Sequence, residues 1–175
     1  MVPVYIKSPM LRNGETVDLR LYRDEDRERL VSFYTSLSKN ALRWALPPYD
    51  RARVERWLAD RENPLILLAL DKGKIVGHLH IYTRSESRTK GIGELFIYIH
   101  DYYQNLGLGT WMMEESLSLT RDRGLHRIGL SVVADNKHAI RLYEKVGFQR
   151  EGVRKQAYYD EDGQYHDMVE MGIIL

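Results

Sequence analysis

The sequence predicts an α/β protein in which a mixed β-sheet carries helices on its faces, in the element order βααβββαβαββ. Two kinds of apolar periodicity support this, because some runs alternate apolar and polar residues whereas others repeat apolar residues every three or four positions. Turn signals separate these runs. Asp71-Lys72-Gly73 lies between two apolar runs as a hairpin turn does, and Gly124 and Gly147 follow helical segments as C-terminal caps.

The N-terminal third predicts one strand and two helices. Residues 17–22 alternate as a strand does, and the next segment predicts a helix that begins with Asp24 as its N-cap and runs to residue 37. The Pro-Pro pair at 47–48 interrupts the chain. A second, shorter helix is expected over residues 51–61, and Asn63-Pro64 ends it.

The middle of the chain predicts a hairpin, a third strand and a long helix. Residues 65–82 form the hairpin, and the polar stretch 84–90 connects it to a strand at 91–100. That strand is expected to lie in the centre of the sheet, because both of its faces are largely apolar. The helix extends from about Leu108 to Arg123. One face of this helix carries Leu108, Trp111, Met112, Glu115 and Leu119.

The C-terminal part predicts a strand, a helix and a final hairpin. Residues 126–133 form the strand, and the helix begins at Asn136 and ends at Gly147. Two further strands, 148–159 and 164–175, flank a turn at 160–163. The chain contains no internal repeat or linker, so residues 1–175 are expected to form a single domain.

Composition narrows the range of functions. Twenty-six basic and 25 acidic side chains give a formal charge of +1, so neither nucleic acid nor an anionic membrane is an expected partner. The absence of cysteine excludes thiolate catalysis, disulfides and cysteine-ligated metals. The longest strongly apolar run, LILLAL, is far shorter than the about 20 residues that span a bilayer. We therefore expect a cytoplasmic protein, either a monomer or a homodimer.

The stretch QNLGLGT at 104–110 joins the predicted central strand to the long helix. A helix N-terminus presents unpaired N–H groups and a partial positive charge, so it binds phosphate where the backbone is accessible. Gly107 and Gly109 are expected to allow a sharp turn and to leave room for a diphosphate. The predicted cradle consists of the amides of Leu106, Gly107, Leu108, Gly109 and Thr110. No Lys-Ser/Thr pair follows, and Met112 replaces the third Gly of a dinucleotide fingerprint.

Two motifs together resemble the GNAT N-acetyltransferase superfamily. Gln104, Gly107 and Gly109 fit its acetyl-coenzyme A signature, Q/R-x-x-G-x-G/A. Residues 136–148, NKHAIRLYEKVGF, are similar to its second signature, N-x-x-A-x-x-x-Y-x-K-x-G-F. The resemblance covers residues 15–175, and the closing EGVRKQAYYDEDGQYHDMVEM resembles the last hairpin of the ribosomal-protein N-terminal and spermidine acetyltransferase branches.

This resemblance implies a GNAT-like fold and an enzyme that transfers an acetyl group from acetyl-CoA to a primary amine by direct attack in a ternary complex. The pantetheine arm would lie between the separated strand segments 94–100 and 128–133, where amides near Ile99 and His100 polarise the thioester. Gln104, Asn136 and Lys145 would contact the coenzyme. Asn136 is also a favoured helix N-cap, a role that does not exclude the coenzyme contact, and the alternative for Lys145 is a solvated cation in a last helical turn.

The resemblance also implies two catalytic side chains. Glu94 would act as the base that accepts the proton of the amine, directly or through water. Alternatively, Glu94 is a solvated carboxylate at a strand edge. Tyr143 would act as the acid beside the leaving thiolate, and its alternative role is that of a core aromatic at helical spacing.

The resemblance also implies that the acceptor site is formed by the first two helices and the last hairpin, with Tyr34, Trp44 and Tyr158 as candidate contacts. The acidic hairpin residues Asp160, Glu161, Asp162 and Asp167 suggest a cationic acceptor such as a polyamine or a basic protein N-terminus, although a solvated Asp-Gly turn is the favoured interpretation. Small amines remain possible acceptors. A non-catalytic acetyl-CoA sensor or a partner-binding module is the rival interpretation. No metal is expected, because His78, His80, His100 and His126 follow no metal-binding motif.

Overall fold

The computed structural model describes residues 6–59, 64–83 and 87–175. One seven-stranded mixed sheet has the strand order β1-β2-β3-β4-β5-β7-β6. The strands are β1 (Asp18–Leu21), β2 (Leu65–Asp71), β3 (Lys74–Thr83), β4 (Ile92–Ile99), β5 (Arg127–Val133), β6 (Gln149–Tyr159) and β7 (Tyr165–Ile174). The helices are α1 (Arg27–Ser36), α2 (Arg51–Ala59), α3 (Leu108–Asp122) and α4 (Lys137–Lys145), with short 3-10 turns at Asp24–Asp26 (η1), Ser87–Thr89 (η2) and Asp101–Tyr103 (η3). The predicted element order βααβββαβαββ is confirmed.

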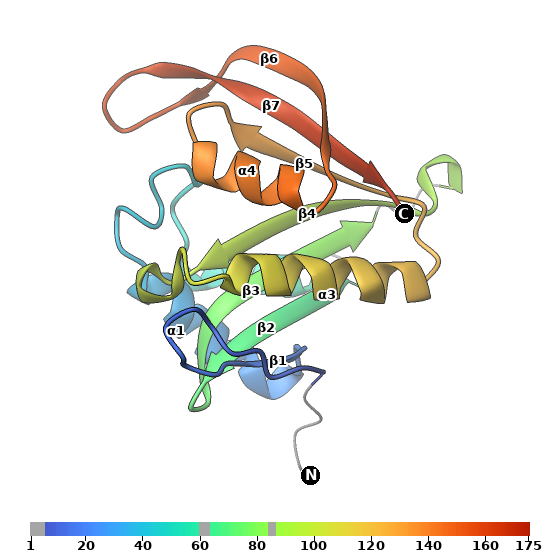
Figure 1. Cartoon of the computed structure of the whole chain (residues 1–175). Helices are drawn as coiled ribbons and strands as arrows, with labels where there is room; N and C mark the ends of the chain where they lie inside the picture. The colour runs from blue at the N-terminus through green and yellow to red at the C-terminus, as the bar shows by residue number, and fades with distance from the viewer. Residues whose placement is uncertain (1–5, 60–63, 84–86) are drawn as a thin grey trace.

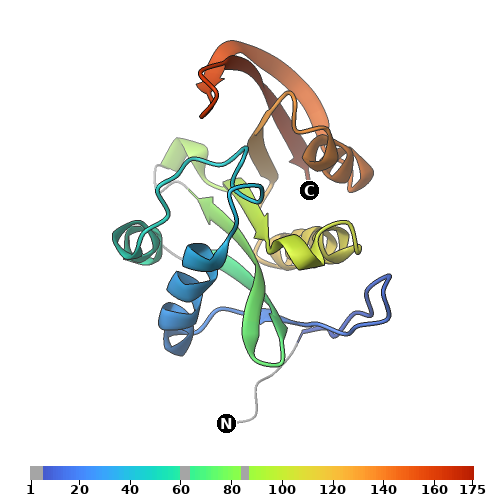
Figure 2. The same ribbon diagram turned by 90° about the vertical axis from the view of Figure 1, so that its left-hand side faces the viewer.

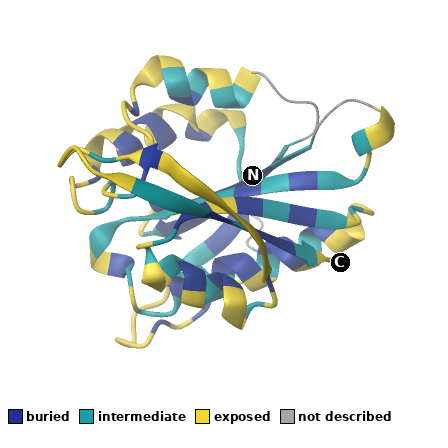
Figure 3. Ribbon diagram, turned by 90° about the horizontal axis from the view of Figure 1, so that it is seen from above, coloured by how far each residue is buried: buried dark blue, intermediate teal, exposed yellow. Residues whose placement is uncertain are grey.

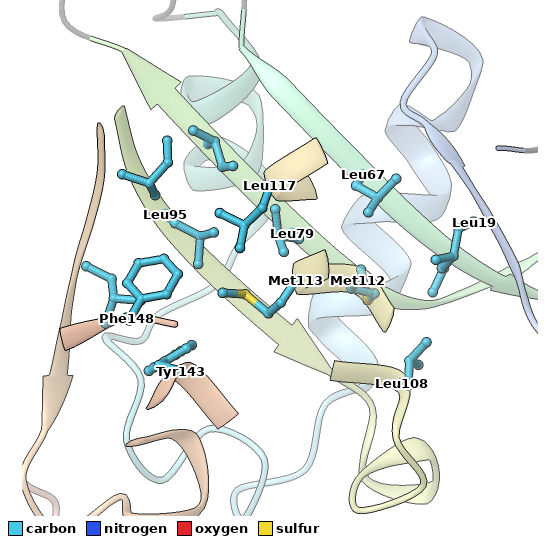
Figure 4. Close-up of a cluster of buried hydrophobic side chains, with 14 of the residues drawn as sticks. Leu19, Leu67, Leu79, Leu95, Leu108, Met112, Met113, Leu117, Tyr143 and Phe148 are labelled. Carbon is cyan, nitrogen blue, oxygen red and sulfur yellow. The ribbon is translucent and has the colours of Figure 1, made fainter. Parts of the chain in front are cut away.

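The helices form two layers, one on each face of the sheet (Figure 1, Figure 2). α3 and α4 cover one face, where Met112, Met113 and Leu117 of α3 pack against Leu79 and Leu95 (Figure 4). α1 and α2 cover the other face through a second apolar cluster that includes Phe33, Tyr34 and Val54. The C-terminal hairpin differs from both layers, since β6 is exposed along almost its whole length (Figure 3).

α3 begins and ends where its glycines predict, but its buried face is rotated. Gly107 is the N-cap with a φ of 92°, and Gly124 follows the helix with a φ of 73°. The fully buried positions are Leu108, Met112, Met113, Ser116, Leu117 and Thr120. Trp111, Glu115 and Leu119, which share the predicted face, are only partly buried, and Trp111 and Leu119 pack against the edge of the core. Lys7 of the N-terminal segment contacts two of these residues, since its ammonium lies 4.6 Å from the Trp111 ring and 3.6 Å from Glu115 Oε2.

The first helix does not begin as predicted. Asp24 starts the 3-10 turn η1, and α1 itself begins at Arg27. Asp26, rather than Asp24, has the structural role, because its buried carboxylate accepts hydrogen bonds from Arg20 at 2.6 and 2.8 Å and from the amide of Arg23 at 3.0 Å. Burial alone would raise the pKa of Asp26, but these hydrogen bonds lower it overall.

The end of the second helix cannot be compared with its prediction, since residues 60–63 lie outside the described chain. Ala59 is the last described residue of α2. The predicted helix end at Arg61 and the boundary residue Asn63 fall in that gap. In the polar connection, the described residues 87–89 form η2.

β4 is the fourth of the seven strands, as its two apolar faces predict. It pairs with β3 over almost its whole length, from Gly77↔Ile99 to Thr83↔Gly93. Its parallel pairing with β5 is much shorter and stops at Glu94↔Gly129. Beyond Glu94 the two strands therefore separate, and this separation creates the candidate functional site.

Candidate functional site

A cavity of about 1090 Å³ lies where β4 and β5 separate, and both sequence motifs contribute to its walls. The predicted coenzyme-binding residues that line it are Ile99, Gln104, Gly107, Gly109, Thr110, Asn136 and Lys145. Both predicted catalytic residues, Glu94 and Tyr143, also line it, as do Trp44 and Tyr158. The fold thus brings together segments that are far apart in the sequence.

The first turn of α3 forms one end of the cavity, and its two glycines have different structural roles. Gly107 needs its glycine backbone because its φ is 92°, and a side chain there would meet open space. Gly109 lies in a crowded position, where a Cβ would come within 2.9 Å of Leu142 Cδ2 and 3.3 Å of Ile99 Cδ1. The space beside Gly109 is therefore occupied by the Leu142 side chain. The sequence had predicted that this space would accommodate a diphosphate.

The amides of this first turn remain available to an anion. Leu106 and Leu108 turn their side chains into or against the core, so only their main chain can contribute. The carbonyl of Gly107 accepts the amide of Trp111, as the start of a helix requires, and the preceding amides have no helical partner of their own.

Two cations approach this turn from outside it. The ammonium of Lys145 lies 3.4 Å from Thr110 Oγ1. Arg12 comes from the N-terminal segment, with its amide donating to Leu106 O at 3.1 Å and its Nη1 to Asn105 O at 3.4 Å. No local pattern singles out Arg12, because it lies far from either motif along the chain. Both side chains line the cavity.

The main chain of β4 offers free groups on the side where β5 has separated. The amide of His100 donates to Val76 O at 2.9 Å, so it points toward β3. It is therefore not available to a ligand, which differs from the prediction. Because successive amides of a strand point in opposite directions, the amide of Ile99 points toward the gap. Gln104 Nε2 donates to Ile99 O at 3.0 Å, which fixes the glutamine side chain under the loop.

Glu94 occupies the point where the two strands part. It pairs with Gly129 of β5 in the last step of the ladder and with Tyr82 of β3 on the other side. Phe96 and Tyr98 follow on the same face of β4, since side chains alternate along a strand. The Glu94 carboxylate is partly exposed and faces the cavity.

Tyr143 reaches the cavity from α4, as the second motif predicts. Its ring lies 6.0 Å from that of Phe148, beside the α3 core (Figure 4). Burial raises the pKa of Tyr143 to about 12. Within the described chain its hydroxyl has no hydrogen-bond partner. It is thus a protonated donor that remains free to bind a ligand.

Asn136 acts as the N-cap of α4, and its side chain accepts the amide of Ala139 at 3.3 Å. The helix-capping role predicted for Asn136 is therefore confirmed. Because Asn136 also lines the cavity, this capping role leaves a contact with a ligand open.

Of the predicted acceptor contacts, Tyr34 is placed differently from expectation. It is only 2% exposed, and its hydroxyl lies 2.6 Å from His78 Nδ1 within the α1–α2 core. Helical spacing could not distinguish a buried tyrosine from one that faces a cavity. Tyr158 is 7% exposed, and its hydroxyl donates to Ala45 O at 2.8 Å and Arg43 O at 3.0 Å. It therefore anchors residues 38–50, which we call the acceptor loop.

The acidic residues of the last hairpin are largely engaged within it. Asp160 Oδ1 accepts the amides of Asp162 at 3.0 Å and Gln164 at 2.8 Å. Asp167 accepts Lys155 Nζ and the amide of Gln156, both at 2.9 Å. These bonds favour a structured turn over a surface that attracts cations.

Neither a metal-binding group nor a membrane-spanning helix is found among the described residues. None of them form a group of three or more His, Asp or Glu side chains that could hold a metal ion. His78 and His80 are fully buried and pack against Phe96. Over the same residues, every helix is too short or too polar to cross a membrane.

Comparison with known proteins agrees with this geometry. Residues 21–148 match the acetyltransferase (GNAT) family. The L-amino acid N-acetyltransferase AaaT of Escherichia coli (strain K12) is 35% identical over 126 residues, which is 71% of this chain and 76% of that protein. A ribosomal-protein-alanine N-acetyltransferase from Brucella melitensis superposes with a TM-score of 0.78 at 25% identity, over 90% of this chain and 99% of that one.

A third relative supports the fold alone, because its identity is only 18%. It is a phosphinothricin acetyltransferase from Sinorhizobium meliloti that was solved in complex with acetyl-CoA, with a TM-score of 0.78 over 92% of this chain and 89% of that one. The match over most of the chain and the 35% identical relative settle the family. The chain belongs to the acetyltransferase (GNAT) family.

Proposed function

We propose that this protein is an acetyl-CoA-dependent N-acetyltransferase that acetylates the primary amine of an amino acid or a related small amine by direct attack in a ternary complex. The observation that carries the proposal is the gap between β4 and β5, where Glu94, Tyr143 and the first turn of α3 share one cavity. The name of the E. coli relative supports the acceptor class. A polyamine acceptor has less support, because hairpin acids such as Asp160 and Asp167 are engaged within the hairpin.

The coenzyme half of the cavity fits acetyl-CoA as a substrate. The amides at the start of α3 and the ammonium of Lys145 suit a diphosphate, because a helix N-terminus and a nearby cation both favour negative charge. Arg12 adds a second cation at the loop. The free amide of Ile99 would donate to the thioester oxygen, where negative charge develops in the transition state.

Glu94 would accept the proton that the amine loses, directly or through one water. An α-amine with a pKa of about 7.7 to 8.0 is unprotonated in roughly one molecule in ten at pH 7, whereas a lysine-type amine is so only in about one in a few thousand. The first value is that of a peptide N-terminus. In a free amino acid the neighbouring carboxylate stabilises the ammonium and raises the pKa of the amine, so the acceptor makes a larger demand on the base. A partly exposed carboxylate at the end of the β4–β5 ladder can meet this demand.

Tyr143 would stabilise the leaving thiolate. A pKa of about 12 keeps its hydroxyl protonated, but full transfer to a thiolate of pKa about 8.5 is uphill by on the order of 5 kcal/mol. We therefore assign Tyr143 a hydrogen bond to the sulfur as the carbon–sulfur bond breaks. The new nitrogen–carbon bond forms at the same carbon, and the thiolate is protonated from solvent.

The test is release of free coenzyme A from acetyl-CoA against amino acids, polyamines, aminoglycosides and short peptides. A thiol reagent reports the product without background, because the chain has no cysteine. We expect turnover with amino acids and a loss in kcat of about 100-fold in Tyr143→Phe. Tyr165→Phe, at an exposed tyrosine of β7, is the matched control and should keep full activity.

The same experiment can contradict the proposal. If acetyl-CoA raises the melting temperature but no acceptor gives turnover, the non-catalytic sensor becomes the better interpretation. If turnover occurs and Tyr143→Phe retains it, the acetyltransferase activity is supported but the catalytic role of Tyr143 is rejected. Cytoplasmic location, the single domain and the oligomeric state remain predictions from sequence.

A further inference from the structure

A histidine of the last hairpin lies between two carboxylates from different segments. His166 Nδ1 lies 2.6 Å from Asp135 Oδ2, and His166 Nε2 lies 2.7 Å from Asp160 Oδ2. Asp135 directly precedes Asn136, the N-cap of α4, whereas Asp160 caps the β6–β7 turn. One imidazole therefore connects the coenzyme helix to the hairpin.

This arrangement requires the charged form of His166. A neutral imidazole has one N–H donor and one acceptor nitrogen, so it can bond only one of two carboxylates. The imidazolium donates to both. The hydrogen bonds to Asp135 first and Asp160 second raise the pKa of His166 above its ordinary value of 6.5.

The same imidazole contacts the wall of the acceptor half of the cavity. The Trp44 ring lies edge-on to it at 5.2 Å, and the Tyr158 ring lies at 6.2 Å. Trp44 lines the cavity, and Tyr158 binds the main chain of the acceptor loop on either side of Trp44. The position of Trp44 is thus set jointly by Tyr158 and His166.

We propose that His166 is a positioning residue of the acceptor site, whose imidazolium fixes Trp44 by holding the start of α4 and the turn of the hairpin together. This inference rests on the proposed function, since it concerns the same cavity. Deprotonation leaves one carboxylate facing a nitrogen lone pair, so the bridge opens and Trp44 loses its support. Acceptor binding, rather than the chemical step, should weaken.

Few other charges act on this bridge. Asp135 comes from the β5–α4 loop and Asp160 from the turn, while from the acceptor loop the guanidinium of Arg43 lies 4.8 Å from the Trp44 ring. Asp167, next in the chain, is occupied by Lys155. The pH dependence of the bridge follows from the raised pKa of His166 in the folded protein. The bridge is complete below about pH 6.5, and it is lost as the pH rises through that higher pKa.

The first experiment measures steady-state kinetics of wild type and His166→Gln at several pH values. At pH 6.5 we expect the variant to raise the acceptor KM about fivefold while kcat stays within about twofold, because acceptor binding alone is affected. The ratio of the two KM values should shrink toward one at high pH, where wild type has lost its bridge too. A ratio that does not change with pH, or a loss in kcat alone, would overturn the proposal.

A second experiment needs no turnover, so it separates this proposal from the proposed function. NMR of ring-labelled histidine, with His166→Gln to assign one of the six signals, gives the pKa of His166 directly. The indole N–H signal of Trp44, assigned with Trp44→Phe, should move with the same midpoint. If it does not respond, His166 does not position Trp44.

Two further variants act as a matched pair in the NMR experiment. Asp135→Asn removes one negative charge from the bridge and should lower the pKa of His166 toward 6.5. Arg150→Gln changes a charge on the same hairpin but far along it from the bridge, where Arg150 pairs with Glu144 at 2.9 Å, and it should leave that pKa within a few tenths of a unit. Equal responses would contradict a specific bridge.

Discussion

The two halves of the cavity are constructed differently. The coenzyme half uses the main chain of one short stretch, 104–110, with Asn136 and Lys145 from the neighbouring α4. The acceptor half uses side chains from distant segments, such as Trp44 and Tyr158, and the hydrogen bond from the Tyr158 hydroxyl to the carbonyl of Arg43 spans 115 positions. A main-chain site can be inferred from local sequence, because glycines and caps fix it. A wall of side chains depends on the tertiary structure.

The largest expected effect tests whether catalysis can be lost while the coenzyme half still binds acetyl-CoA. Glu94→Gln should lower kcat/KM by about 100-fold at pH 7, and activity should partly recover as the pH passes the pKa of the amine. Because Glu94 lies outside the coenzyme half, the rise in melting temperature with acetyl-CoA should stay unchanged. A parallel loss of that rise would mean that the two halves are not separable.

The next test addresses the main chain of the coenzyme half. Gly107→Ala forces a φ of 92° on a residue with a side chain, which strains or shifts the backbone, so acetyl-CoA should bind about tenfold more weakly. The acceptor KM at saturating acetyl-CoA should not change. Isothermal calorimetry gives the affinity, and an unchanged affinity would remove Gly107 from the cradle.

Gly109→Ala sharpens the same comparison, because this position is crowded rather than strained. The new Cβ would meet the flexible Leu142 side chain, so the loss of acetyl-CoA affinity should be about threefold. Leu142→Ala should relieve part of the loss when combined with Gly109→Ala, yet it should give no relief to Gly107→Ala. Equal relief in both backgrounds would contradict the different roles of the glycines.

A smaller effect is expected from the cations of the coenzyme half. Lys145→Gln and Arg12→Gln should each raise the KM for acetyl-CoA about two- to threefold, and the effect should diminish at high salt because both groups are exposed. The acceptor KM is the internal control. If only the acceptor KM rose, Lys145 and Arg12 would belong to the acceptor half of the cavity instead.

The smallest effect concerns the acidic hairpin. Asp162→Asn and Glu161→Gln should change the KM of a cationic amine such as spermidine by less than about twofold, since neither side chain lines the cavity. Steady-state kinetics with spermidine and a neutral amino acid provide the measurement. A selective rise in the spermidine KM would restore the hypothesis of a cationic acceptor.

The fold and the coenzyme half could be predicted largely because their determinants are local. Gly124 and Gly147 end their helices at positive φ, and Asn136 caps α4, as their sequence contexts predict. Gly107 lies at the turn that starts α3 for the same reason. Each of these conclusions needs only the residue and its immediate neighbours.

The errors have a common physical cause, which is competition from groups distant in sequence. Asp24 lost its capping role because the buried Arg20 of β1 required Asp26 as a partner. His100 is paired across to Val76 of β3. Tyr34 was assigned to the acceptor site although His78 binds it in the core. No local pattern reports such partners.

The bond from Tyr158 to the acceptor loop also has a consequence for evolution and engineering. The hydroxyl joins the last hairpin to the main chain on both sides of Trp44, so neither segment has an independent shape. Grafting the loop of a relative with another preference, without its hairpin, would leave the new Trp44 equivalent unsupported. We expect acceptor preference to be inherited and exchanged as a loop–hairpin pair, while the coenzyme half stays constant beneath it.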